Sequence, residues 1–124
     1  MASMATGISS ALAPTGRLRA TINLGNPVLA QRHPDGRIGG VSTALAHALA
    51  RRLGVPLDLH PFDGAGAAFA ALAAGDCDIG FLARDPKRAE EVAFTAPYVV
   101  IEGTCLVRQD SPIIDVTTID AAGH

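Results

Sequence analysis

The stretch GDCDIGFLARDPKRAEEVAFTAPY, residues 75–98, contains the signals that decide the fold. Asp78–Leu82 is short, apolar and bounded by turn residues, so it predicts a buried strand. Asp85 and Pro86 predict the start of a short helical turn, because aspartate caps helices and proline suits their first position. The basic side chains that follow the strand are Arg84, Lys87 and Arg88. Ligands bind at the carboxyl ends of strands in open α/β sheets, so this corner is the first candidate for a site.

The rest of the chain predicts a β-α-β-α-β order. The expected elements are a strand at Arg17–Leu24, a helix at Val41–Leu53, a strand at Leu57–Pro61, a helix at Ala65–Ala74 and the strand at Asp78–Leu82. The longer helix places five apolar residues at helical spacing on one face, namely Val41, Leu45, Ala48, Leu49 and Leu53. This alternation predicts the α/β class, a three-layer α/β architecture in which helices cover a parallel sheet through right-handed crossovers.

Composition excludes several classes of function. The chain has 124 residues, 48% of them hydrophobic, and a net charge of −2 without a basic run, so we expect no nucleic-acid partner. No apolar run is long enough to span a membrane, and residues 1–14 do not form a complete signal peptide. The two cysteines, Cys77 and Cys105, are interpreted as small buried hydrophobes, although pairing in an oxidising compartment stays open.

Three short motifs carry a family resemblance. Asp78-Ile79, then Asp85–Ala89, then Phe94–Tyr98 resemble, in order and spacing, the signature of family 3 extracellular solute-binding proteins. The resemblance extends over about residues 17–120. It implies one lobe of a type II periplasmic binding protein, in which Val99–Val107 is a hinge strand added to the sheet. It also implies a periplasmic or extracellular location, a small polar solute such as an amino acid or organic anion, and an ABC permease as partner.

The resemblance implies a division of the chain into three parts. We expect a flexible N-terminal segment at residues 1–16, the first lobe at 17–98, and a hinge strand with the truncated start of the second lobe at 99–124. A chain of this length covers one lobe, so it is either a fragment or a half-protein. Exchange of the arm at 99–124 between two copies would give a homodimer. Because half of the contacts are missing, we expect the half-chain alone to bind solute weakly or not at all.

Arg88 is the leading candidate for a ligand-binding residue. At the position that it matches, the resemblance implies an arginine that clamps the α-carboxylate of an amino acid. The planar fork of a guanidinium suits this role, because it donates two parallel hydrogen bonds to one carboxylate. The alternative is a surface arginine that pairs with Glu90 or Glu91.

The other predicted ligand-binding residues are Asn23, Asn26, Phe81, Ala83 and Asp85. Asn23 and Asn26 follow the first strand and either contact the ligand or form local turns. Ala83 stands where the family has a hydroxyl, and Asp85 stands where it has threonine. Asp85 is interpreted as a cap of the turn, and binding of a ligand ammonium is the alternative. The loop after the first strand has no ring to stack on a ligand.

The sequence predicts neither a metal site nor a cofactor site. Asp76 and Asp78 lack a nearby histidine, and the segment from Gly64 to Phe69 resembles a dinucleotide fingerprint only weakly. No arrangement of Ser, Cys or His supports nucleophilic catalysis, so we predict a binding protein rather than an enzyme. The alternatives on the same fold are a dehydratase and the sensor domain of a receptor.

Overall fold

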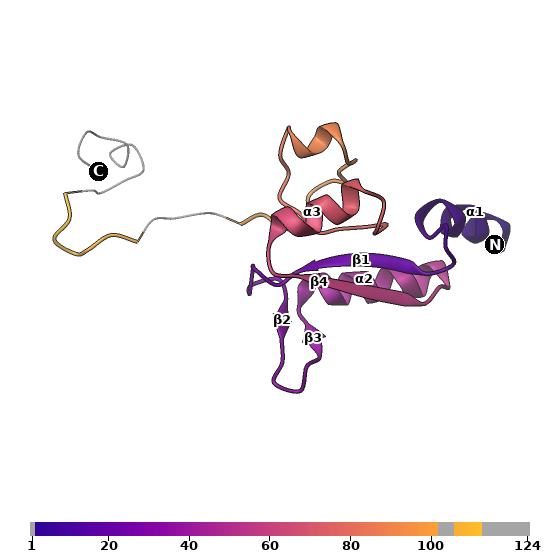
Figure 1. Cartoon of the computed structure of the whole chain (residues 1–124), viewed down its shortest axis with the longest axis horizontal. Coiled ribbons are helices and arrows are strands. Elements are labelled where there is room, and N and C mark those ends of the chain that lie inside the picture. The colour runs from indigo at the N-terminus through magenta and orange to yellow at the C-terminus, as the bar shows by residue number, and fades with distance from the viewer. Residues whose placement is uncertain (1, 102–105, 113–124) are drawn as a thin grey trace. The chain divides into compact units, whose positions relative to one another are not determined.

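The computed structural model of the chain is built on two parallel strands (Figure 1). These strands, β1 (Leu18–Asn23) and β4 (Leu57–Phe62), pair along their whole length. β1 is the centre of the core, because Leu18, Ala20 and Ile22 are fully buried on one of its faces. Both strands lie where the sequence predicts them, within one residue at each end, and the predicted α/β class with a parallel sheet is confirmed.

The predicted third strand is much shorter than expected. Of the stretch Asp78–Leu82, only Ile79 pairs with β1, in a single parallel bridge to Ala20. The N–H groups of Asp78 and Ile79 both donate to the carbonyl oxygen of Arg19, at 2.7 and 3.2 Å. The carbonyl oxygen of Ile79 in turn accepts a 3.0 Å hydrogen bond from the N–H of Thr21, which completes the bridge, and no strand is formed over Gly80–Leu82. The prediction of a strand over 78–82 was therefore wrong in extent, although its position beside β1 was correct.

An ion pair holds this segment to β1. The carboxylate of Asp78 accepts hydrogen bonds from Arg19 Nη2 at 2.8 Å, from Arg19 Nε at 3.1 Å and from the Arg19 backbone N–H at 2.9 Å. The Asp78 side chain is only 6% exposed. Burial alone would raise the pKa of Asp78, but the hydrogen bonds from Arg19 outweigh it and lower this pKa below its usual value. The Arg19–Asp78 ion pair therefore adds to the single bridge at Ile79 in holding this segment beside β1.

Helix α2 (Val41–Leu53) has the bounds that the sequence predicts. It ends at Gly54, which adopts a left-handed conformation (φ 71°) that glycine reaches without steric cost. Two arginines, Arg51 and Arg52, lie in its last turn, where they favour the negative end of the helix dipole.

The buried face of α2 differs from the predicted one. Its buried residues are the small side chains Ser42, Thr43, Ala46 and Ala50. Of the predicted apolar face, Leu49 and Leu53 pack against the core, whereas Val41 and Leu45 remain 45% and 39% exposed. Small side chains allow the helix to approach the sheet closely, and this geometry leaves part of the apolar stripe in solvent.

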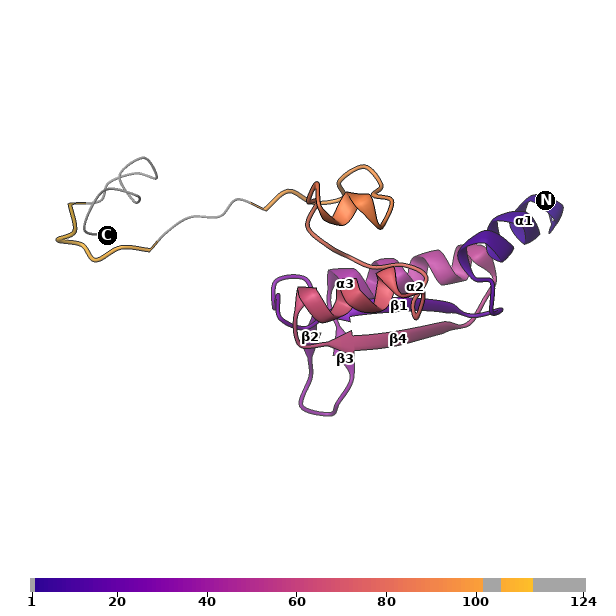
Figure 2. The same cartoon turned by 45° about the horizontal axis from the view of Figure 1, so that its top comes forward.

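Helix α3 (Ala65–Ala73) covers the other face of β1 (Figure 2). Side chains alternate along a strand, so Thr21 points away from the face that packs on α2. Thr21 is buried, and an added Cβ at Gly80 would lie 2.8 Å from its hydroxyl and 3.1 Å from Leu72 of α3. α3, Thr21 and the segment after Ile79 thus pack together as the third layer.

The first residues form a helix that the sequence did not predict. α1 (Ala2–Leu12) contacts α2, and Ser9 Oγ donates a 2.7 Å hydrogen bond to the carbonyl oxygen of Leu53. Ala13, just after the helix, is buried in the core cluster. We expected a flexible segment at residues 1–16; in the structure Ser9 and Ala13, in the second half of this segment, contact the rest of the chain.

The remaining described elements are short. β2 (Gln31–Arg32) and β3 (Ile38–Gly39) form an antiparallel hairpin around a turn at Pro34–Gly36. The structure describes residues 2–101 and 106–112, and the chain forms two compact units, residues 1–94 and 95–124.

Within the described part of Val99–Val107 no strand forms, while Cys105 lies outside the described residues. In the described ranges, no helix has the length and apolarity needed to cross a membrane.

Candidate functional site

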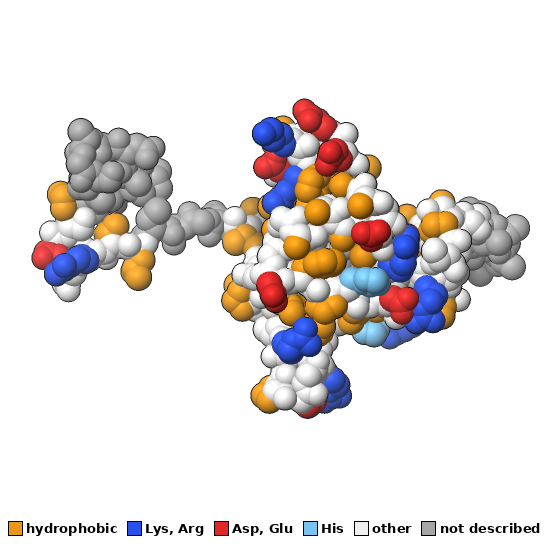
Figure 3. Space-filling view, viewed as in Figure 1, with side chains coloured by type: hydrophobic (Ala, Val, Ile, Leu, Met, Phe, Trp, Pro, Cys, Tyr) orange, Lys and Arg blue, Asp and Glu red, His pale blue; other side chains and the backbone are white. Residues whose placement is uncertain are grey.

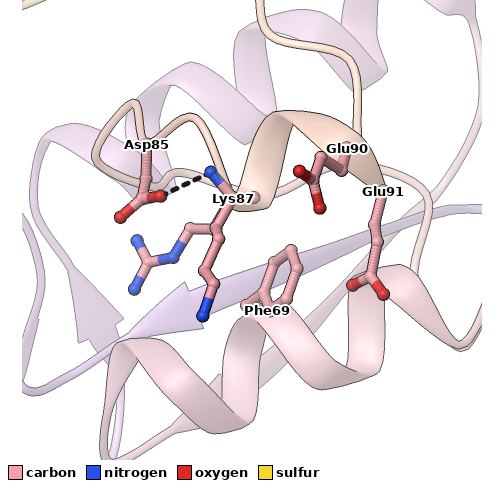
Figure 4. A pocket seen from close by; sticks show the side chains of 6 residues that line it. Phe69, Asp85, Lys87, Glu90 and Glu91 are labelled. Atoms are coloured by element: carbon pink, nitrogen blue, oxygen red, sulfur yellow. Dashed lines mark hydrogen bonds between the residues drawn. The ribbon is translucent and has the colours of Figure 1, made fainter.

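A hollow of about 390 Å³ lies between α3 and the turn that follows the segment Asp78–Leu82 (Figure 4). The turn contains η1 (Arg88–Glu90), a 3-10 helix. The hollow is lined by Phe69, Asp85, Lys87, Arg88, Glu90 and Glu91. Charged side chains of both signs gather on this part of the surface, at the top of Figure 3. Two of the predicted ligand-binding residues, Asp85 and Arg88, are therefore brought together here.

The guanidinium of Arg88 has two contacts. Its Cζ atom lies 5.8 Å from the centroid of the Phe69 ring, and Nη1 donates a 3.4 Å hydrogen bond to the carbonyl oxygen of Ala83. Among the described residues no ion pair joins Arg88 to Glu90 or Glu91, which was the alternative interpretation of this arginine. Nε and Nη2 have no acceptor in the described part of the chain, so one edge of the guanidinium is available to a ligand.

Asp85 caps the turn. Its Oδ1 atom accepts a 2.8 Å hydrogen bond from the N–H of Lys87, and its backbone carbonyl accepts one of 2.9 Å from Ala89. This is the preferred interpretation of Asp85 from the sequence. Because the carboxylate is exposed and its Oδ2 has no hydrogen-bond partner within the described ranges, it can also accept a hydrogen bond from a ligand.

The other four predicted residues do not line the hollow. The side chains of Asn23 and Asn26 close local turns, because their Oδ1 atoms accept hydrogen bonds from Gly25 at 2.8 Å and Val28 at 3.2 Å. Ala83 contributes its backbone carbonyl oxygen, which accepts the hydrogen bond from Arg88 Nη1. Phe81 is half-buried in the segment before the hollow.

Four lining residues were missed by the sequence analysis: Phe69, Lys87, Glu90 and Glu91. The last three are neighbours of Arg88, so their proximity is a local signal that could have been used. Phe69 belongs to α3 and is half-buried. It is the only ring in an alanine-rich helix, which was the one available hint that it faces something other than the core.

Metal binding and thiol chemistry receive no support from the described residues. No group of three or more His, Cys, Asp or Glu side chains in residues 2–101 and 106–112 is arranged to hold a metal ion. Cys77 is buried, and burial raises the pKa of its thiol, which disfavours the reactive thiolate. Its suggested pairing with Cys105 falls outside the described part of the chain.

A comparison with protein families finds one that matches most of this chain. The model of the bacterial extracellular solute-binding proteins, family 3, matches residues 18–119. Among curated proteins, none matches the chain.

Solved structures of similar proteins include binding proteins and an enzyme. An ancestral cyclohexadienyl dehydratase has a TM-score of 0.62 and 27% identity, with 71% of this chain and 37% of that chain covered. An ABC-transporter binding component from Wolinella succinogenes, complexed with lysine, has a TM-score of 0.62 and 26% identity, with 68% and 36% covered. Domain 1 of the arginine-binding protein from T. maritima, in an arginine-bound form, has a TM-score of 0.63 and 27% identity, with 71% and 69% covered. The chain thus spans well under half of the two longer relatives and about two thirds of the single domain.

Proposed function

The chain belongs to the bacterial extracellular solute-binding proteins of family 3, and we propose that its first lobe binds an amino acid in the hollow beside Arg88. The observation that carries this proposal is the free Nε–Nη2 edge of Arg88, which is held over Phe69 and matches the two oxygens of a carboxylate. Asp85, on the same hollow, is the acceptor for the α-ammonium group. Arginine, lysine and glutamine are the first candidates, because structural relatives bind them.

We propose binding rather than catalysis, although a dehydratase has a similar structure. The three carboxylates that line the hollow, from Asp85, Glu90 and Glu91, are all exposed to solvent. A general acid needs a carboxyl that burial or a like charge keeps protonated near neutral pH, and exposure works against that. In the intact protein the lobe would deliver its solute to the permease of an ABC importer, in the periplasm or outside the cell.

Titration calorimetry on the folded 124-residue chain tests the proposal. We expect saturable binding of at least one of L-arginine, L-lysine and L-glutamine, and much weaker binding of argininamide, which lacks the carboxylate of arginine. The arginine-bound domain 1 of the T. maritima protein argues that a first lobe alone can hold its ligand, against our expectation of weak or absent binding. A folded chain that binds none of the three amino acids at millimolar concentration would contradict the proposal.

The arm at residues 99–124 supports a second proposal, an exchange between two copies of the chain. Several large apolar side chains of its described residues are exposed, including Val100 at 83%, Ile101 at 55% and Leu106 at 102%. Apolar side chains so exposed favour burial against another surface. We expect light scattering coupled to chromatography to give the mass of a dimer, and Val100→Ser with Leu106→Ser to shift it toward monomer. A monomeric wild-type chain at high micromolar concentration would exclude the exchange.

A further inference from the structure

We propose that Phe69 is a positioning residue for Arg88, whose ring keeps the carboxylate-binding edge of the guanidinium free. This inference rests on the proposed function, because it explains how the arginine is prepared for its ligand. The loop after β1 carries no aromatic ring. The structure instead supplies a ring to the hollow from α3, on the opposite wall from the η1 turn (Figure 4).

Two contacts from different segments orient the guanidinium. Phe69 lies 5.8 Å from Arg88 Cζ, within the range of a cation–π interaction, and the Ala83 carbonyl accepts from Nη1. The carbonyl therefore occupies one end of the planar group, and Nε and Nη2 form the remaining edge. That edge is one of the geometries in which arginine donates two parallel bonds to a carboxylate.

The glutamates next to Arg88 explain why the ring is needed. Glu91 follows Arg88 by three residues in a 3-10 turn, and side chains with this spacing lie on the same side. An ion pair between them would occupy the guanidinium edge that the ligand needs. Among the described residues this pair does not form, and Figure 4 shows Phe69 between Lys87 and the two glutamates. Stacking on the ring competes with the pairing.

Packing alone does not account for the position of Phe69. The fully buried residue of α3 is its neighbour Ala68, whereas Phe69 is half-buried and lines the hollow. A half-buried ring beside a cation contributes through its charge distribution as well as through buried area. A leucine at the same position would keep most of the apolar volume but would lose the attraction to the guanidinium.

The test compares Phe69→Leu with Phe69→Tyr in the full 124-residue chain, with L-arginine and argininamide as ligands. We expect Phe69→Leu to weaken arginine binding by about 3- to 30-fold, and Phe69→Tyr to change it little because the ring is kept. Argininamide lacks the carboxylate, so its weak binding should change less. The double variant Phe69→Leu with Glu91→Gln should recover part of the lost affinity, since the competing ion pair is gone. A merely structural role of Phe69 predicts no such recovery.

A measurement without ligand separates this inference from the proposed function. In the wild-type chain the Phe69 ring should shift the Arg88 Hδ protons upfield in the NMR spectrum, and Phe69→Leu should abolish the shift. Arg88 protons at ordinary positions in the wild type would overturn the inference whether or not the chain binds arginine. An upfield shift without any amino-acid binding would leave the stacking intact and contradict the proposed function instead. Equal losses for arginine and argininamide in Phe69→Leu would also overturn the positioning role.

Discussion

Replacing Arg88 by alanine should weaken amino-acid binding by about 100-fold or more. Removing one member of a buried, hydrogen-bonded charge pair typically costs about 2–5 kcal/mol, and a 100-fold loss lies in the lower part of that range, which suits a half-buried arginine. Arg88→Lys should recover only part of this loss, since an ammonium keeps the charge but lacks the planar fork. The dissociation constant for L-arginine, measured by titration calorimetry at fixed salt, gives the result.

Arg84 provides the matched control. It is also a basic residue of the same turn, but it is exposed and does not line the hollow. Arg84→Ala removes the same charge, so it reports any general electrostatic attraction of the ligand. We expect it to change the affinity by less than about 3-fold, a small electrostatic effect in solvent. If Arg84→Ala and Arg88→Ala weaken binding equally, the role assigned to Arg88 is wrong.

Asp78→Ala should lower the free energy of unfolding by about 2–4 kcal/mol, the largest stability effect that we expect from one side chain. The variant removes three hydrogen bonds to a charged group and leaves Arg19 partly buried without its partner. Urea unfolding followed by far-UV circular dichroism measures the difference. Asp58→Ala is the control, because Asp58 forms a similar bidentate pair with Arg17 whose side chains are 37% and 49% exposed. We expect little change from it, since exposed pairs contribute little.

The contribution of Asp78 to the free energy of unfolding should decrease in strong acid. The pKa of Asp78 is lowered in the folded chain, so its contribution to stability is fully present above about pH 4, the usual pKa of an unfolded aspartate. That contribution is lost as the pH falls through the lower, folded-state pKa. The difference between wild type and Asp78→Ala should therefore be constant from pH 5 to 7 and shrink in stronger acid. A difference that grew as the pH fell would contradict the assigned ion pair.

Local signals were sufficient to predict where most elements lie. The bounds of α2 follow from glycines at both of its ends and from basic residues in its last turn, all of which act within a few residues of the helix terminus. Its buried face could not be predicted in the same way. Five apolar residues satisfy helical spacing, yet the buried residues include Ser42, Ala46 and Ala50, because close packing depends on small side chains and on the neighbouring surface.

Helix α1 and the segment Asp78–Leu82 also could not be predicted from local sequence signals. The prediction for residues 1–16 contained no helix, and α1 is placed by contacts with α2, including the hydrogen bond from Ser9 to Leu53. The segment Asp78–Leu82 has the composition of a strand, but it is held to β1 by one bridge at Ile79 and by the Arg19–Asp78 pair. Both outcomes depend on residues that are far apart in sequence, and periodicity within one segment does not report them.

For the candidate site, the sequence by itself determined that Arg88 and Asp85 share one turn, because a few residues with cap and proline signals specify it. Membership in the solute-binding family followed from the same motifs. Only the tertiary structure decided which ring meets the guanidinium and which carbonyl holds it. Phe69 belongs to another element, and a contact between elements exists only after the sheet and helices have packed. The sequence thus identified the charged groups of the site, and packing decided which of their edges is left for a ligand.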